Sequence, residues 1–191
     1  MLKRTGLLFT LAATLAVPAI CALGSQATHA AAPAQECVPL VLFYWGAKTC
    51  YLPAHLAAAE RRLAPRPVNP ERVLARLTRL PLRQAIVLSG TGAGRPGPAI
   101  AVVYVFGTPT AMICPPGSHC PHIPLYVTVQ ETVGHRAGAG MTVDNNTGNV
   151  PGPWRLSANI PGRDLSLDVE SNTKSKQLIR EIGQGIVRTA T

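Results

Sequence analysis

The residues best suited to chemistry stand in one short stretch, CPPGSHCPH, at positions 114–122. It places Cys114, His119, Cys120 and His122 close together, and zinc is bound in proteins by tetrahedra of thiolates and neutral imidazoles. The two cysteines could instead close a stiff, proline-rich loop through a disulfide. The compartment of the protein decides between these interpretations, because thiols persist in the reducing cytosol and oxidise outside it.

The start of the chain has the order of features typical of a secretory signal peptide. A positively charged start precedes a nearly apolar run from Gly6 to Leu23, and small residues follow that run. This order predicts a signal peptide over residues 1–30, with cleavage after Ala27 or Ala30. The part that remains, residues 31–191, has the length of one ordinary domain.

Two alternatives to cleavage stay open. The apolar run has about the minimum length that crosses a bilayer, so it could be retained as an anchor, although Pro18 and the small residues favour cleavage. Cys21 could carry a lipid, although Ile20 precedes it where bacterial lipidation sites usually have a small residue. No other segment is long and apolar enough to span a membrane. We therefore expect an extracytoplasmic protein, secreted or held in the cell envelope, without an integral membrane segment after cleavage.

Signal cleavage would remove one of the five cysteines and leave an even number in an oxidising compartment. Four cysteines allow three pairings, and local spacing favours Cys37 with Cys50 and Cys114 with Cys120. We expect these two disulfides, with His119 and His122 as exposed loop residues and no cofactor. The metal site made of Cys114, His119, Cys120 and His122 is the alternative.

Basic residues are concentrated between Glu60 and Arg83, where seven arginines and two glutamates give a net charge of +5 in a chain of formal charge +9. A helix that begins at Asn69-Pro70-Glu71 and runs to about Leu80 would set three of these arginines on one face, since successive residues turn by ~100°. Such a face could bind anionic lipid or a cell-wall polymer. The residues expected to bind anions are Arg72, Arg76, Arg79 and Arg83.

The simpler interpretation of these arginines is a solvated helix face. Arginine outnumbers lysine fourteen to four, and Ala, Pro and Gly are abundant, as a GC-rich genome would produce. Nucleic acid is not an expected partner, because aromatic residues make up 5% of the chain and base-stacking platforms are scarce. The sequence predicts no oligomeric state.

No catalytic residue is predicted. His55 and His135 lie in a probable helix and a Gly-rich loop, and neither belongs to a known catalytic motif. Asp168 and Glu170, close to Asp164, share one face of a strand, a spacing that glycosidases could use. Two acids on the solvent face of an edge strand explain this more simply. We expect a non-catalytic binding or structural module, with a secreted hydrolase of unrecognised site as the alternative.

The elements that must position these residues are read from hydrophobic periodicity. Helices are expected at Leu52–Leu63, at 69–80 and near the C-terminus, where an apolar stripe runs from Leu178 to Val187. The expected strands are Val38–Trp45, Ala85–Ser89, Ile100–Phe106, Leu125–Val133, Met141–Val143, Trp154–Ile160 and Leu165–Val169. These elements predict an α+β domain: an antiparallel sheet of about six strands, two early helices and a C-terminal helix packed on it.

Glycines in two places need an explanation. The glycine-rich run SGTGAGRPGP is similar to a phosphate-binding loop. However, Arg95 stands where such a loop requires glycine, and Pro96 and Pro98 prevent the helix that would hold the phosphate. A hairpin connection is therefore expected there. In the last helix Gly183 and Gly185 each cost ~1 kcal/mol relative to alanine, so packing on the sheet must hold this helix.

Four segments from Ile100 onward carry a family resemblance: IAVVYVF, PLYVTVQE, PWRLSANIPGRDLSLDVES and KQLIREIGQGIV. Their order resembles an extracytoplasmic domain of unknown function in bacterial envelope proteins, sometimes fused to anti-sigma factors and similar to lipoprotein-carrier sheet proteins. The resemblance covers roughly half of the chain without a diagnostic motif, and the chain lacks an anti-sigma or transmembrane segment. VPLVLFYW followed by VNPERVLARLTRLP is similar to the start of a sporulation and germination envelope domain. Both resemblances imply an envelope protein, and neither supplies catalytic residues.

Overall fold

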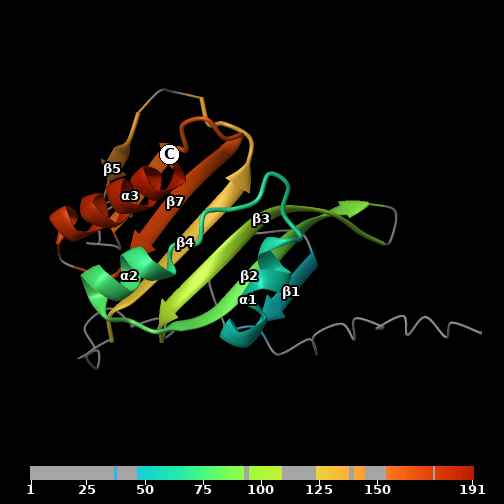
Figure 1. Ribbon diagram of the computed structural model, residues 1–191, viewed down its shortest axis with the longest axis horizontal. Helices are drawn as coiled ribbons and strands as arrows, with labels where there is room; N and C mark the ends of the chain where they lie inside the picture. The colour runs from blue at the N-terminus through green and yellow to red at the C-terminus, as the bar shows by residue number, and fades with distance from the viewer. Residues whose placement is uncertain are drawn as a thin grey trace, which may run out of the picture. The chain divides into compact units, whose positions relative to one another are not determined.

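Antiparallel pairing joins seven strands of this computed structural model into one sheet (Figure 1). The structure describes residues 37, 47–92, 95–108, 124–137, 140–144, 154–173 and 175–191, all of which belong to a compact unit that extends over residues 31–191. The strands are β1 Ala47–Tyr51, β2 Leu82–Gly92, β3 Arg95–Gly107, β4 Tyr126–Val133, β5 Thr142–Asp144, β6 Trp154–Asn159 and β7 Leu165–Ser171.

The strand order across the sheet is β1-β2-β3-β4-β7-β6-β5. The glycine run connects β2 and β3, which pair as far as Gly92 opposite Arg95, so the expected hairpin is confirmed. β6 and β7 form a second hairpin around Pro161 and Gly162, where Gly162 has a φ of 72° that suits glycine. Both hairpins therefore arise where the sequence places its turn residues.

The helical elements within the described residues are the 3-10 turn η1 Pro53–His55 and the α-helices α1 Leu56–Glu60, α2 Glu71–Thr78 and α3 Lys176–Ala190. The first expected helix, Leu52–Leu63, is shorter in the structure, because its start is the 3-10 turn and α1 has only five residues. α2 begins as expected, with Asn69 Oδ1 accepting a hydrogen bond from Glu71 N at 2.8 Å. α2 ends at Thr78, two residues before the expected Leu80.

One face of the sheet carries the main hydrophobic core. Residues of α1, α2 and α3 pack there against alternate residues of the strands, among them Val102, Tyr104 and Phe106 of β3, and Figure 1 shows the helices on this side. A smaller cluster lies on the opposite face, where Ile86, Val103 and Val105 are buried with Cys50. β2 and β3 are therefore buried on both faces, which explains their continuous apolar sequences.

The two glycines of α3 lie at its closest contacts. A Cβ atom on Gly183 would stand 2.6 Å from Leu156 Cδ1 of β6, and one on Gly185 would stand 2.7 Å from Val73 Cγ1 of α2. Glycine therefore lets α3 approach both the sheet and α2, and this packing offsets the low helix propensity of both residues.

The expected α+β class is confirmed, but the sheet has seven strands rather than about six. β1, with the sequence AKTCY, was not predicted, because only its last two residues, Cys50 and Tyr51, are buried and it shows no alternation. The expected strand Val38–Trp45 lies outside the described residues. Among the helices that the structure describes, none has the length and apolar character needed to cross a bilayer.

Candidate functional site

The four arginines expected to bind anions lie on α2 and in the chain that follows it, and all four are exposed. We call Arg72, Arg76, Arg79 and Arg83 the arginine surface. Arg72 and Arg76 belong to the outer side of α2, whose opposite side is buried against the core. Arg79 follows the last helical residue, and Arg83 stands where the register between β2 and β3 shifts.

Arg79 departs from the expected helical geometry. Its φ of 58° is left-handed, and it is the one non-glycine residue with a positive φ in the part of the chain that the structure describes. Because α2 ends at Thr78, the stripe expected for three arginines is limited within the helix to Arg72 and Arg76. Thr78 caps the end of α2, since its Oγ1 donates to Leu74 O at 2.7 Å.

None of the four arginines forms a hydrogen bond or ion pair with another described residue. Other arginines provide the three ion pairs found in the described residues: Arg66 with Glu60, Arg136 with Asp168 and Arg155 with Glu170. The guanidinium groups of the arginine surface therefore face solvent without an internal carboxylate.

A cavity of about 760 Å³ lies beside α2. The connection between α1 and α2, the β6–β7 turn and the end of α3 all contribute to its wall. The residues that matter for its chemistry are Glu60, Arg66, Arg72, Arg163 and Thr189, and we call this space the arginine cavity.

The acid of the arginine cavity is weakly paired. Arg66 Nη2 lies 3.5 Å from Glu60 Oε2, and the side chain of Arg66 is 71% exposed whereas that of Glu60 is 5% exposed. Glu60 Oε1 is buried and has no hydrogen-bond partner among the described residues. Arg163 Nη1 donates to Arg66 O at 3.0 Å, which joins the β6–β7 turn to the α1–α2 connection.

Two further polar side chains, Tyr104 and Glu131, are fully buried on the same face of the sheet. Val68 N donates to Glu131 Oε2 at 2.7 Å, whereas Glu131 Oε1 and Tyr104 Oη have no hydrogen-bond partner among the described residues. Tyr104 Oη lies close enough to Glu60 for that side chain to raise the pKa of Tyr104. Glu131 is therefore an acidic residue enclosed by core side chains.

Burial raises the pKa of Glu131 to about 8, against the opposing effects of the Val68 hydrogen bond and of Arg163, and the Glu60 carboxylate raises it further. Burial is also the main cause that raises the pKa of Tyr104, with smaller contributions from the charges of Glu131 and Glu60. At neutral pH Glu131 is therefore mainly protonated and Tyr104 neutral, so that both could donate a hydrogen bond.

Glu60 and Glu131 were not among the predicted site residues, although both interrupt apolar periodicity. Glu131 occupies the inward phase of β4 with Val127 and Val129, and Glu60 lies four residues after Leu56 on the buried side of α1. An acid at an apolar position of an amphipathic element was therefore the available signal.

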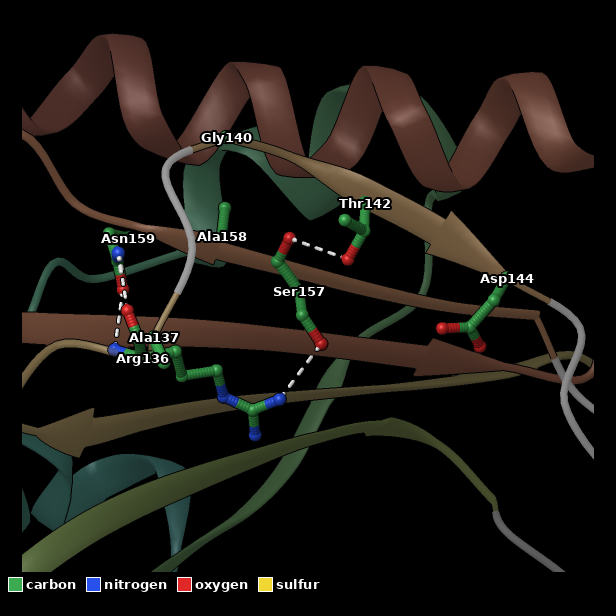
Figure 2. Close-up of a pocket in the computed structure, with 8 residues that line it drawn as sticks. All are labelled: Arg136, Ala137, Gly140, Thr142, Asp144, Ser157, Ala158 and Asn159. Carbon is green, nitrogen blue, oxygen red and sulfur yellow. Dashed lines mark hydrogen bonds between the residues drawn. The ribbon is translucent and has the colours of Figure 1, made fainter.

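A second pocket, of about 270 Å³, lies beside β5 and β6 (Figure 2). Arg136 Nη1 donates to Ser157 Oγ at 3.1 Å, and Ser157 Oγ donates to Asp168 Oδ1 at 2.7 Å. Arg136 also pairs directly with Asp168. Figure 2 shows Arg136 reaching along the pocket to Ser157, so these side chains form a closed polar network.

The two acids with a spacing that glycosidases could use, Asp168 and Glu170, lie on β7. Asp168 and Glu170 share the face of β7 opposite the helices, as alternation predicts, but β7 is an interior strand between β4 and β6 and not an edge strand. Asp168 is held by Arg136 and Ser157, and Glu170 accepts a hydrogen bond from Arg155 Nη2 at 2.9 Å. Each carboxylate is thus paired with a guanidinium across the sheet.

Neither of the described histidines, His55 and His135, is among the residues that line the two pockets, although His135 contacts Arg163 of the arginine cavity. His55 ends η1, and His135 Nε2 contacts Arg163 O at 2.6 Å in an exposed loop. Cys37 and Cys50 form a disulfide with a Cα–Cα distance of 5.5 Å. The described residues contain no group of three or more His, Cys, Asp or Glu side chains that could hold a metal. The residues of the other expected disulfide or metal site, Cys114, His119, Cys120 and His122, lie outside the described residues.

Comparison of the chain with protein-family models, with curated protein sequences and with solved structures yields no match. The resemblance to an envelope domain therefore rests on the order of sequence segments alone.

Proposed function

We propose that the protein is an exported, non-catalytic binding module of the bacterial cell envelope whose arginine surface binds an anionic lipid or a cell-wall polymer. The observation that carries the proposal is the set of four exposed arginines that form no hydrogen bond or ion pair with another residue in the described part of the chain. Guanidinium groups bind phosphate and carboxylate in a bidentate geometry. They belong to a segment, residues 60–83, whose net charge is +5.

The conformation of Arg79 supports a role for this surface. A left-handed backbone costs an L-residue roughly 1–2 kcal/mol, and glycine is the residue that usually follows a helix in this conformation. An arginine at this position, with a φ of 58°, therefore costs stability. An arginine in this unfavourable conformation is expected if its guanidinium binds a partner outside the chain.

Electrostatics within the fold offer the competing explanation. Arg76 and Arg79 lie near the C-terminus of α2, where the helix dipole favours positive charge by about 0.3–1 kcal/mol. This explanation predicts that their removal lowers stability and leaves binding to anionic surfaces unchanged. Binding and stability must therefore be measured separately.

The non-catalytic part of the proposal is supported by the pairing of the candidate acids. Asp168 and Glu170 each contact an arginine, so both carboxylates already have a partner within the fold. A screen for turnover of generic esterase, glycosidase and peptidase substrates tests this part. Turnover that Asp168→Asn or His135→Ala abolishes would favour the hydrolase alternative.

Location and binding are tested by separate measurements. Export predicts a secreted product without residues 1–30, detectable by N-terminal sequencing. Binding predicts sedimentation with anionic vesicles or purified cell walls at ~50 mM salt and a steep loss at ~300 mM, because exposed charges are screened over about 10 Å at 0.1 M salt. Absence of sedimentation at low salt, or sedimentation that salt does not affect, would contradict the proposal.

A further inference from the structure

The arginine cavity contains a buried acid whose charge is poorly compensated. Glu60 is 4% exposed and contributes to the cavity wall. Its Oε1 has no hydrogen-bond partner among the described residues, and its Oε2 has only the 3.5 Å contact with the exposed Arg66. A buried carboxylate is stable when a cation or several donors satisfy its oxygens. Oε1 is enclosed by the protein, so a ligand in the cavity would add its donor at Oε2, beside Arg66.

The rim of the cavity is basic. Arg72 and Arg163 contribute to it together with Arg66, and Arg163 uses Nη1 for the carbonyl of Arg66, which leaves its remaining N–H groups for other acceptors. Three arginines and two glutamates, Glu60 and Glu71, line the cavity, so its lining carries one net positive charge. A complementary ligand combines a cation that can contact Glu60 with an anion that can contact the arginines.

We propose that the arginine cavity binds a molecule in which a primary ammonium is joined by a short chain to a phosphate group. The ammonium donates to the Glu60 carboxylate, and the phosphate accepts hydrogen bonds from Arg163 and Arg72. Thr189 Oγ1 donates to Ile186 O at 2.8 Å and keeps a lone pair that can accept from the ammonium. The volume of about 760 Å³ lies within the range of roughly 300–1,000 Å³ that is typical of small-ligand sites.

This inference goes beyond the proposed function, since it concerns a cavity and not the exposed arginine surface. The two share only Arg72, so the variants that test the cavity leave this residue unchanged. The same chemistry occurs in free O-phosphoethanolamine and in the ethanolamine headgroup of a phospholipid. The experiment therefore includes both sources.

Calorimetric titration of the secreted protein compares O-phosphoethanolamine with inorganic phosphate, ethanolamine and phosphocholine. We expect O-phosphoethanolamine to bind at least about 10-fold more tightly than the other three, because phosphate and ethanolamine each lack one charged group and phosphocholine has no N–H. Vesicles of phosphatidylcholine with and without phosphatidylethanolamine identify the source. Preference for the free compound indicates a soluble ligand, and preference for the vesicles indicates a headgroup.

Two variants locate the binding groups. Glu60→Gln should abolish the preference for O-phosphoethanolamine over inorganic phosphate, whereas Arg163→Gln should weaken the binding of both by about 10-fold. Arg180→Gln, which replaces an exposed arginine of α3 outside both sites, is the matched control and should change neither. Arg79→Gln belongs to the arginine surface and should weaken sedimentation with anionic vesicles. If Glu60→Gln fails to fold in a thermal unfolding control, Arg163→Gln decides the test.

Equal affinity for O-phosphoethanolamine and inorganic phosphate, or no binding of any probe, would overturn the inference. A preference that survives in a folded Glu60→Gln variant would overturn it as well. Because Arg79→Gln acts on the exposed surface alone, failure of the cavity and failure of the arginine surface give different results.

Discussion

Val68 donates its backbone N–H to the buried Glu131 carboxyl group at 2.7 Å, across 63 positions of sequence. This hydrogen bond ties the α1–α2 connection to β4, in the middle of the sheet. The same connection contributes Arg66 and Val68 to the wall of the arginine cavity. The position of the cavity wall therefore depends on a titratable group that is fully buried.

The first prediction concerns pH. Burial raises the pKa of Glu131 to about 8, above the ordinary value of about 4.3 in an unfolded chain. Between these values the folded protein binds more protons than the unfolded chain, so the free energy of unfolding falls as pH rises. We expect Glu131→Gln to lose less stability than the wild type between pH 5 and pH 9, by on the order of a few kcal/mol.

Urea unfolding at several pH values measures this difference. Titrating groups that do not interact with Glu131 affect wild type and variant equally, so the difference between the two curves reports Glu131 together with its coupling to Glu60 and Tyr104. The variant should have nearly wild-type stability at pH 5 and should gain relative to the wild type above pH 8. Parallel curves over the whole range would show that Glu131 has an ordinary pKa in the folded protein.

The second prediction concerns the contact between α3 and the sheet. Helix propensity alone would make Gly183→Ala stabilising by ~1 kcal/mol. In the fold a Cβ at this position would lie 2.6 Å from Cδ1 and 2.7 Å from Cδ2 of Leu156, which is fully buried. We expect a net loss of about 1–3 kcal/mol, measured by chemical unfolding. If Gly183→Ala is stabilising, the described packing of α3 on β6 is incorrect.

The third prediction concerns the end of α2. Arg79→Gly should raise stability by about 0.5–1 kcal/mol, because relief of the left-handed conformation, roughly 1–2 kcal/mol, exceeds the entropy cost of glycine. Arg76→Gly, within the same helix, is the matched control and should lower stability by about 1 kcal/mol. Thermal unfolding of both variants compares them directly. Equal losses for both would show that Arg79 continues the helix.

The fourth prediction concerns the cysteines. Peptide mapping of the secreted protein without reduction should give one linked pair from Cys37 and Cys50, which the structure joins, and one from Cys114 and Cys120. Replacement of Cys37 and Cys50 by alanine should lower stability by about 3 kcal/mol, since the pair closes a short loop. Free thiols at Cys114 and Cys120 together with bound zinc would support the metal-site alternative.

Strand periodicity was sufficient to predict most of the sheet, because several of its strands alternate between buried and partly exposed residues. β4, β6 and β7 have this pattern, and their turns contain the glycine and proline residues that turns require. β1 could not be recognised in this way, since its pairing with β2 depends on partners that are about 40 residues distant. Tertiary context, and not local propensity, determines such a strand.

The arginine surface could be predicted as a concentration of charge, but its geometry could not. The early end of α2 depends on the hydrogen bond of the Thr78 hydroxyl and on the left-handed backbone of Arg79. A helical wheel represents neither of these. The arginine cavity combines Glu60 and Arg66 with Arg163, about 100 positions later in the chain. Only the folded arrangement brings these charges together.

The most direct test of the central claim compares two double variants in sedimentation with anionic vesicles at ~50 mM salt. Arg76→Gln with Arg79→Gln removes two charges of the arginine surface, and Arg180→Gln with Arg188→Gln removes two exposed charges of α3. Because both variants lose the same net charge, the account predicts at least about 10-fold weaker binding for the first and nearly unchanged binding for the second. Equal binding by the two variants would contradict the claim that the arginine surface is the binding site.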